Sequence, residues 1–235
     1  MKILNWWALA DGRETADSWR QWARQPHGEI TTQTLPPCPH IPMMSLRRMS
    51  AGTRLAVECG LTLLEQQAVD MAIFTSRHGE LERTHKILQH LNQQQPLSPT
   101  DFAMSVHNTA AGWLTIIAKN TLPTTSLAAG EDSFQQGILE AQGILASGAA
   151  ERVLLVDFDG ALPEDYQPFV TLTARPYALA LLLAAGESLQ CVPVARQAAA
   201  ESLPQSLSFL RHWLSGQTEF IVPGPRHDWR WTYDG

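Results

Sequence analysis

The chain has 235 residues, of which 44% are apolar and 17% are charged, so it can bury a sizeable core as one large domain or two small ones. Its net charge is −6 and its only basic cluster is Arg47-Arg48, which argues against a nucleic-acid-binding protein. The three scattered cysteines form neither a CxxC pair nor an even disulfide framework, as is usual in a reducing compartment.

Strand-like and helical patterns alternate along the first half of the chain. Ser50 is suited to N-cap a strongly amphipathic helix, and the apolar run that follows this helix is typical of a buried strand. Four prolines predict a loop before this helix. The expected elements are a strand at 2–10, a helix at 17–24, a loop at 35–42, a helix at 50–68, a strand at 69–76, a loop at 77–80, a helix at 79–91 and a polar connection at 93–98.

The second half continues the alternation. The expected elements are a helix from Ser98 through His107, an apolar helix at 109–118, a strand-like run at 126–129, a helix at 133–148, a strand at 152–158, one strand or two short ones at 177–185, and a tail at 201–235 with one short helix and a Pro/Trp-rich end. Strands alternating with helices predict an α/β layered fold. The longest apolar run near the C-terminal half, 177–185, is too short to cross a bilayer, and the N-terminal run lacks the features of a signal peptide. We therefore expect a cytoplasmic protein without a membrane span.

The low charge and the eight tryptophans leave two interpretations open. Part of the apolar surface is covered by another subunit, or the protein simply has a large core. No glycine-rich phosphate loop and no GxSxG motif occurs, so we expect no cofactor.

The stretch from Pro123 to Phe134 has the form of a nucleophile turn without its nucleophile. A short β-prone run leads directly into a helix, whose first N–H groups and positive dipole end favour an anion. Enzymes place a reactive cysteine or serine at such turns. The candidates here are Gly130, Glu131 and Asp132, and all three cysteines lie elsewhere. We interpret Ser133 as a capping or helix-surface serine.

Other polar residues favour structural roles. Asp157 and Asp159 end a buried strand, where α/β enzymes often keep functional groups, but carboxylates at such ends more often accept hydrogen bonds from loop N–H groups. His85 and His90 are five residues apart and do not share a helix face, which argues against a zinc site. His107 precedes a small-residue helix and is interpreted as structural.

The segment from Asn108 to Asp159 resembles the N-terminal half of the β-ketoacyl synthases, which have the thiolase fold. In that family a helix with Asn-x-x-x-Gly leads through a Gly-Pro turn and a strand to the motif Thr-Ala-Cys-x-Ser, and a helix ending in Gly-x-Ala-Asp and a hydrophobic strand follow. The corresponding stretches here are Asn108-Thr-Ala-Ala-Gly112, Leu122-Pro123, Ala129-Gly-Glu-Asp-Ser133, Gly148-Ala-Ala-Glu151 and Val153-Leu-Leu-Val156. The two patterns align without a gap, and Glu131 falls where the family has its nucleophilic cysteine.

The resemblance implies a thiolase-like layered α/β fold, essentially the N-terminal half of a ketosynthase with a truncated C-terminal part. We expect one domain over residues 1–235, with a core at 1–185 and a short extension at 186–235. Glu131 cannot form an acyl thioester, and His212 and His227 lack the small glycine-flanked loops of the family's catalytic histidines. We therefore assign no catalytic residue and leave open whether the chain has any activity of its own.

A non-catalytic role is implied by the same resemblance. Chain length factors lack the cysteine and pair with an active β-ketoacyl-ACP synthase in type II polyketide and aryl polyene systems. Such a subunit would shape the acyl tunnel during polyene, polyketide or fatty acyl elongation, and would meet the acyl carrier protein only indirectly. No nucleic-acid or membrane partner is expected.

The resemblance also implies which residues face the partner. Ketosynthases pair through the strand before the cysteine, here Thr124, Thr125, Ser126, Leu127, Ala128 and Ala129. The residues expected to cap or shape the partner's tunnel are Asp101, Phe102, Met104 and Ser105. A bulky side chain at the tunnel end would stop elongation sterically, because a packed pocket tolerates extra methylenes poorly. The alternative interpretation makes Phe102 and Met104 core residues of this subunit.

Two other functions stay open at this point. The chain is an enzyme in its own right if Glu131 supports malonyl decarboxylation, as a glutamine does in initiation-type ketosynthases. That chemistry needs oxyanion donors or histidines that the sequence does not reveal. The chain is otherwise a purely stabilising partner subunit with no influence on the product.

Overall fold

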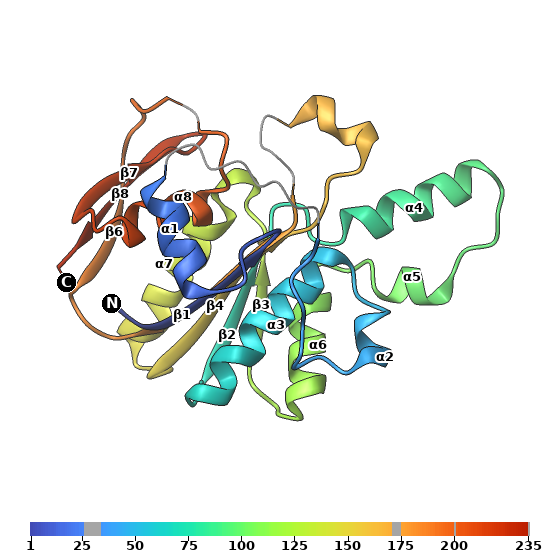
Figure 1. The fold of residues 1–235 in the computed structure, drawn as a ribbon, viewed down its shortest axis with the longest axis horizontal. Helices are drawn as coiled ribbons and strands as arrows, with labels where there is room; N and C mark the ends of the chain where they lie inside the picture. Colours follow the sequence, from blue (N-terminus) through green and yellow to red (C-terminus); the bar gives the residue numbers. More distant parts are fainter. Residues whose placement is uncertain (26–33, 171–174, 200, 235) are drawn as a thin grey trace.

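The computed structural model describes residues 1–25, 34–170, 175–199 and 201–234. Its centre is a five-stranded sheet in the order β1-β5-β4-β2-β3 (Figure 1). The strands in that order are β1 (Lys2–Ala10), β5 (Tyr177–Ala184), β4 (Arg152–Asp159), β2 (Met71–Thr75) and β3 (Thr124–Leu127). β4, β2 and β3 are parallel, whereas β1 and β4 run antiparallel to β5.

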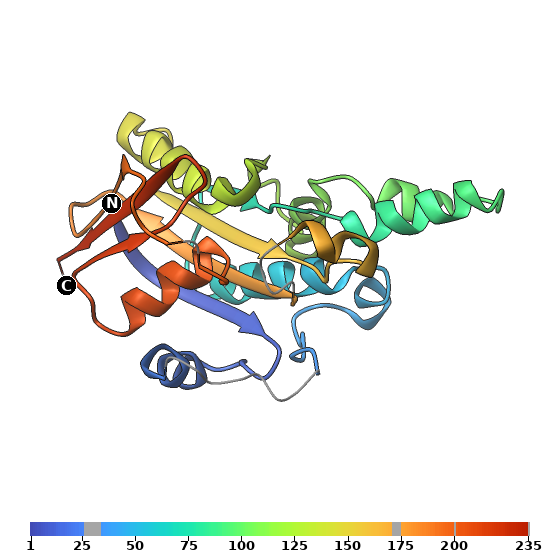
Figure 2. The same cartoon turned by 90° about the horizontal axis from the view of Figure 1, so that it is seen from above.

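Helices cover both faces of this sheet. Figure 2 shows α3 (Ala51–Gln66) and α7 (Ser133–Ser147) on opposite sides of the central strands. Successive strand residues point to opposite faces, so Ile73 and Leu155 join the cluster under α7, while Phe74 and Leu154 join the cluster under α3. α6 (Thr109–Ala118) packs beside α3. Every residue of β5 is buried, as expected for a strand covered on both faces.

The C-terminal part adds a second sheet. β6 (Leu189–Ala195), β8 (His227–Tyr233) and β7 (Glu219–Val222) form three antiparallel strands, next to α8 (Gln205–Leu214). Trp229 and Trp231 are buried in the same cluster as α7, so the Trp-rich tail packs on its own chain. The sequence predicted only one short helix here. Pro193 in β6 argues against a strand except at the edge of a sheet, the position that β6 occupies.

The remaining elements lie around these two sheets. They are α1 (Ala16–Arg24), α2 (Met43–Leu46), α4 (Leu81–Asn92), α5 (Pro99–Ala103), and the single turns η1 (Gly130–Asp132) and η2 (Glu164–Phe169). α1 packs on α8. α4 and α5 project from the body as an arm, and neither helix contains a fully buried residue (Figures 1 and 2).

Most predicted elements are confirmed, including the N-cap of α3, where the Ser50 hydroxyl accepts the N–H of Thr53. The helix expected from Ser98 through His107 is wrong: α5 ends at Ala103. Side-chain hydroxyls stabilise the loop that replaces it, because Ser105 donates to the Phe102 carbonyl and Thr109 donates to that of Val106. In the described ranges no helix is long and apolar enough to cross a membrane.

One hydrophobic cluster contains residues from both the expected core and the expected extension. Leu189, Phe209 and Trp231 belong to it together with Ile73 and Leu155 of the central sheet. The single domain over residues 1–235 and its division at residue 185 both stay predictions.

A buried acid–base pair holds the proline-rich loop on α3. The imidazole Nδ1 and the backbone N–H of His40 both contact the carboxylate of Glu58, whose side chain is 3% exposed, and the second ring nitrogen lies 3.2 Å from Glu65. The hydrogen bond to Glu58 raises the pKa of His40, and burial raises the pKa of Glu58.

Replacing this histidine should destabilise the protein. His40→Ala leaves Glu58 buried without its partner, and we expect a loss of about 2 kcal/mol in the free energy of unfolding at pH 6. The pKa of His40 is raised by folding, so its contribution is complete below about pH 6.5 and is lost as the pH rises through the folded-state pKa. Urea titrations at pH 6 and pH 9 measure both effects. Glu65→Gln, at a 64% exposed position, is the control and should change stability little; an equal loss in both variants would contradict the assignment.

Candidate functional site

The turn between β3 and α7 is held rigidly by its own backbone and by Ser133. Gly130 has a φ of +65°, the left-handed region that favours glycine. The Ser133 hydroxyl accepts the N–H of Ala129 at 2.9 Å and lies 2.7 Å from the carbonyl of Gly130, to which it donates. Its side chain is buried and binds the backbone of the turn that precedes α7, so Ser133 is neither a surface serine nor the N-cap of this helix.

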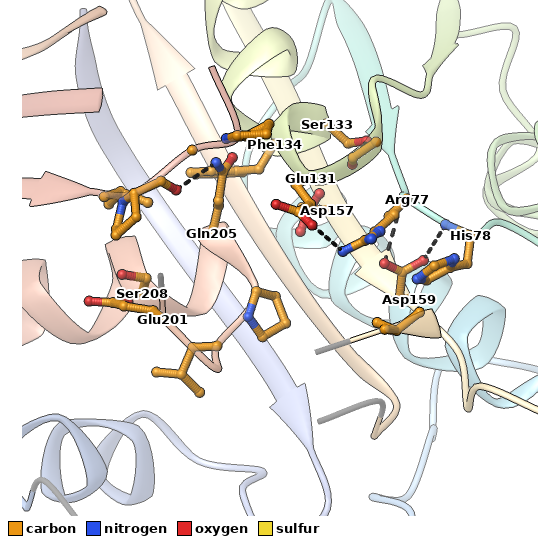
Figure 3. Close-up of a pocket in the computed structure, with 18 of the residues that line it drawn as sticks. Arg77, His78, Glu131, Ser133, Phe134, Asp157, Asp159, Glu201, Gln205 and Ser208 are labelled. Atoms are coloured by element: carbon orange, nitrogen blue, oxygen red, sulfur yellow. Dashed lines mark hydrogen bonds and ion pairs between the residues drawn. The ribbon is translucent and has the colours of Figure 1, made fainter. Parts of the chain in front are cut away.

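Glu131 forms an ion pair at the position where the resemblance puts a nucleophile. Its carboxylate Oε1 lies 3.3 Å from Nη1 of Arg77, in the loop that follows β2 (Figure 3). The side chain of Glu131 is 44% exposed and that of Arg77 is 21% exposed. The basic partner of this glutamate therefore comes from its own chain.

Asp132 turns inward and connects the turn to the C-terminal part. Its Oδ1 accepts hydrogen bonds from the Gln205 amide at 2.8 Å and from the Trp229 indole at 3.0 Å. A side chain at Gly224 would collide with this group, since its Cβ would lie 2.8 Å from Oδ1 of Asp132. Nothing in the sequence indicated this role for Asp132, because its partners are more than seventy residues away.

Asp157 is fully enclosed at the end of β4. It accepts hydrogen bonds from the hydroxyls of Thr75, Tyr177 and Ser206 at 2.6, 2.9 and 2.5 Å. Burial raises the pKa of Asp157 to about 6, although these hydroxyls act in the opposite direction. The carboxylate therefore joins the central sheet to α8.

Asp159 stabilises the loop that carries Arg77. It accepts the hydroxyl of Ser76 at 2.6 Å and the backbone N–H groups of His78 and Arg77 at 2.9 and 3.3 Å. This geometry supports the expected role in binding loop N–H groups. Burial raises the pKa of Asp159, whereas burial and the neighbouring Arg77 lower the pKa of His78 and favour its neutral form.

A cavity of about 100 Å³ lies beside this turn. Its polar lining includes Arg77, His78, Glu131, Asp159 and Tyr177, while apolar walls come from α7, η2 and the C-terminal part (Figure 3). His78 is the only histidine in the described lining; His212 instead accepts or donates a hydrogen bond with Gln217. The described residues include no group of three His, Cys, Asp or Glu side chains that could hold a metal ion.

The four residues expected at the partner's tunnel lie on the arm, away from the described cavity lining. Phe102 is 68% exposed, which excludes it from the core of this subunit. Met104 is half-buried against the cluster under α3. Ser105 is occupied by its hydrogen bond to the Phe102 carbonyl.

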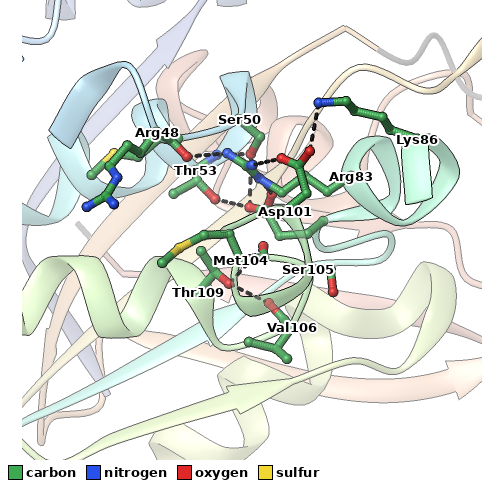
Figure 4. Close-up of polar contacts among 12 residues, drawn as sticks. Arg48, Ser50, Thr53, Arg83, Lys86, Asp101, Met104, Ser105, Val106 and Thr109 are labelled. Carbon is green, nitrogen blue, oxygen red and sulfur yellow. Dashed lines mark hydrogen bonds and ion pairs between the residues drawn. The ribbon is translucent and has the colours of Figure 1, made fainter. Parts of the chain in front are cut away.

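Asp101 belongs to a polar network that fixes the arm to the body (Figure 4). It forms ion pairs with Lys86 at 2.7 Å and Arg83 at 3.0 Å, and both lower its pKa. Arg83 also binds Glu80 at 3.1 Å, and this buried carboxylate accepts the hydroxyl of Ser50 at 2.9 Å. No sequence motif marked this network, because its members come from three separate segments.

β3 occupies the edge of the central sheet and hydrogen-bonds only to β2 among the described strands. Thr124 is exposed, and Thr125, Ser126 and Leu127 are half-buried. In the single chain β3 ends at Leu127, so Ala128 and Ala129 lie beyond it, and the residues that pair with a partner stay a prediction. The strand ends there because the backbone turns into η1, where Ser133 binds the Ala129 N–H.

The profile of the β-ketoacyl synthase N-terminal domain matches residues 19–232. The chain belongs to this family. A chain from the solved complex of the ketosynthase ApeO with its chain length factor ApeC, from Xenorhabdus doucetiae, is 45% identical over 98% of both chains, with a TM-score of 0.93. A search of curated proteins gave no match.

More distant ketosynthase structures share the fold alone. The ishigamide ketosynthase/chain length factor is 16% identical with a TM-score of 0.65, over 81% of this chain and 66% of the other. A β-ketoacyl synthase from Burkholderia phymatum is 11% identical with a TM-score of 0.60, over 81% and 64%. These similarities confirm the thiolase-like layered α/β fold expected from the sequence.

The enclosed carboxylate of this ketosynthase-like chain should make its stability depend on pH. The folded-state pKa of Asp157 is about 6, above the unfolded value of about 3.8, so ionisation opposes folding. We expect the ionisation of Asp157 to lower the free energy of unfolding by about 2 kcal/mol as the pH rises from 4 to 7.

Asp157→Asn should remove most of that slope in denaturant titrations at pH 4.5, 5.5 and 6.5. Asp17→Asn, at an exposed position, is the control and should keep the slope of the natural protein. An unaltered slope in Asp157→Asn would show that another group is responsible.

Proposed function

We propose that this chain is a non-catalytic chain length factor that pairs with an active β-ketoacyl-ACP synthase and shapes its acyl tunnel. The observation that carries the proposal is the Glu131–Arg77 ion pair at the nucleophile turn. A carboxylate held by an arginine cannot form the acyl thioester on which condensation depends. The 45% identity to a chain of a ketosynthase–chain length factor complex supports the same role.

The edge strand β3 suits the pairing that the proposal requires. An edge strand presents unpaired N–H and C=O groups, which bind readily to a strand of another chain. β3 is short and uncharged, so its side chains offer no repulsion to such a partner. Two edges meeting here would extend the five-stranded sheet across the interface.

The arm offers the partner an apolar surface. Its exposed apolar residues are Leu88, Leu91, Leu97, Phe102 and Val106. Contiguous exposed apolar residues commonly mark protein–protein interfaces. The network around Asp101 and Arg83 holds α5 in a fixed orientation, so Phe102 is presented as a preorganised side chain.

The narrower parts of the proposal concern the biological setting. The single-half form of the family is associated with aryl polyene clusters, and we propose that this chain acts in aryl polyene biosynthesis in the cytoplasm. The acyl carrier protein would then be met through the active subunit.

Phe102 provides a direct test. Co-expression with a cognate synthase should give a stable 1:1 complex, measured by light scattering after size-exclusion chromatography. Phe102→Ala in that complex should lengthen the main product by one or more extension units, because the tunnel end gains about the volume of a phenyl ring. Val192→Ala, at an exposed position of β6, is the control. A monomeric chain would overturn the pairing, and an unchanged product profile would overturn the tunnel role.

Glu131 separates the proposal from a catalytic alternative. Glu131→Ala should leave the condensation rate of the complex within about twofold, because the ion pair with Arg77 is partly exposed and contributes little. A decarboxylase that uses this glutamate would instead lose activity by about 100-fold or more. Malonyl consumption and product formation by the purified complex measure both quantities.

A further inference from the structure

We propose that the cavity beside the nucleophile turn binds a small carboxylate with a short apolar body, and that the ligand's carboxylate takes the place of Glu131 at Arg77. This inference concerns the chain alone and does not depend on pairing with a synthase.

The volume of the cavity and its apolar walls suit such a ligand. Its volume is about 100 Å³. Apolar cavities of about 150 Å³ accommodate benzene, so this one has room for a body of about four carbons. Its apolar walls are formed by Phe134, Val170, Leu203, Val222 and Pro223.

Arg77 supplies a cationic group that is incompletely satisfied. Its side chain is 21% exposed, and the 3.3 Å contact to Glu131 is longer than the usual 2.7–2.9 Å of a charge-assisted hydrogen bond. Nη1 is buried and has no hydrogen bond of standard geometry to the described residues. A guanidinium is built to bind a carboxylate through parallel hydrogen bonds, which Glu131 does not provide here.

Glu131 can leave at small cost. Its side chain is 44% exposed, and partly exposed ion pairs contribute little to stability. When Glu131 turns to solvent, two other acids of the lining keep their own hydrogen-bond partners. Asp157 and Asp159 each accept three hydrogen bonds. Glu201 lies 3.8 Å from His212, which lowers its pKa.

The remaining charges of the lining also suit an anion. Arg175 and Arg196 line the same cavity as Arg77. The three arginines equal in number the three other acids of the lining, Asp157, Asp159 and Glu201, so the lining has no formal net negative charge once Glu131 has turned to solvent. Glu131 therefore acts as an internal competitor for the binding site.

Calorimetric titration of the full chain with sodium butyrate at pH 7 tests the inference. Glu131→Gln should bind butyrate at least fivefold more tightly than the natural protein, because the competitor is removed. Arg77→Gln should lose binding. Butanol, which has the same body without the charge, should not bind to any of these proteins.

Two further variants keep the test informative. Glu140→Gln removes the same charge at an exposed position of α7 and should bind like the natural protein. Leu203→Trp fills the cavity and leaves Arg77 in place, so it should abolish binding even if Arg77→Gln fails to fold. Butyrate binding that is absent from both the natural protein and Glu131→Gln, or that Glu131→Gln weakens, would overturn the proposal, as would retained binding in Leu203→Trp.

Discussion

The turn at Glu131 depends on two buried carboxylates that bind the C-terminal part of the chain. Asp132 accepts hydrogen bonds from Gln205 and Trp229, and Asp157 accepts one from Ser206. A buried carboxylate without such partners is strongly unfavourable, so each acid requires that α8 and β8 stay in place. The face of the sheet that carries α7 is thereby closed by residues of the same chain, and the turn keeps a fixed shape without a second ketosynthase half.

This closure also gives the turn a structural role. The turn connects β3 to α7, and both elements contribute to the fold whether or not a nucleophile is present. The ion pair of Glu131 with Arg77 then neutralises a guanidinium that the sheet places at the same edge. The structural role of the site and its proposed partner-facing role use different surfaces: the turn is anchored inward, whereas the edge strand and the arm are directed outward.

The sequence predicted the layered order of strands and helices well, because the elements carry their own period of apolar residues, and a capping side chain marks some helix starts, as Ser50 does for α3. The prediction from the sequence was wrong or incomplete where the local residue pattern was weak. The helix through His107 was wrong because hydroxyls of Ser105 and Thr109 bind backbone carbonyls in place of helical hydrogen bonds. The small C-terminal sheet was missed because its strands are stabilised by burial of Trp231 under distant elements, which no local pattern records.

By itself, the sequence determined that the chain has a ketosynthase-like N-terminal fold, because the fold follows from the order and spacing of local motifs, and the same resemblance predicts Glu131 at the nucleophile position. Only the tertiary structure decided what surrounds that position. Arg77, Asp132, Gln205 and Trp229 come together from segments far apart in the chain, since parallel strands bring their carboxyl ends to one edge and the tail folds back over them. Long-range contacts of this kind leave no periodicity in the sequence, so the cavity, its charges and the exposed Phe102 could be found only in three dimensions.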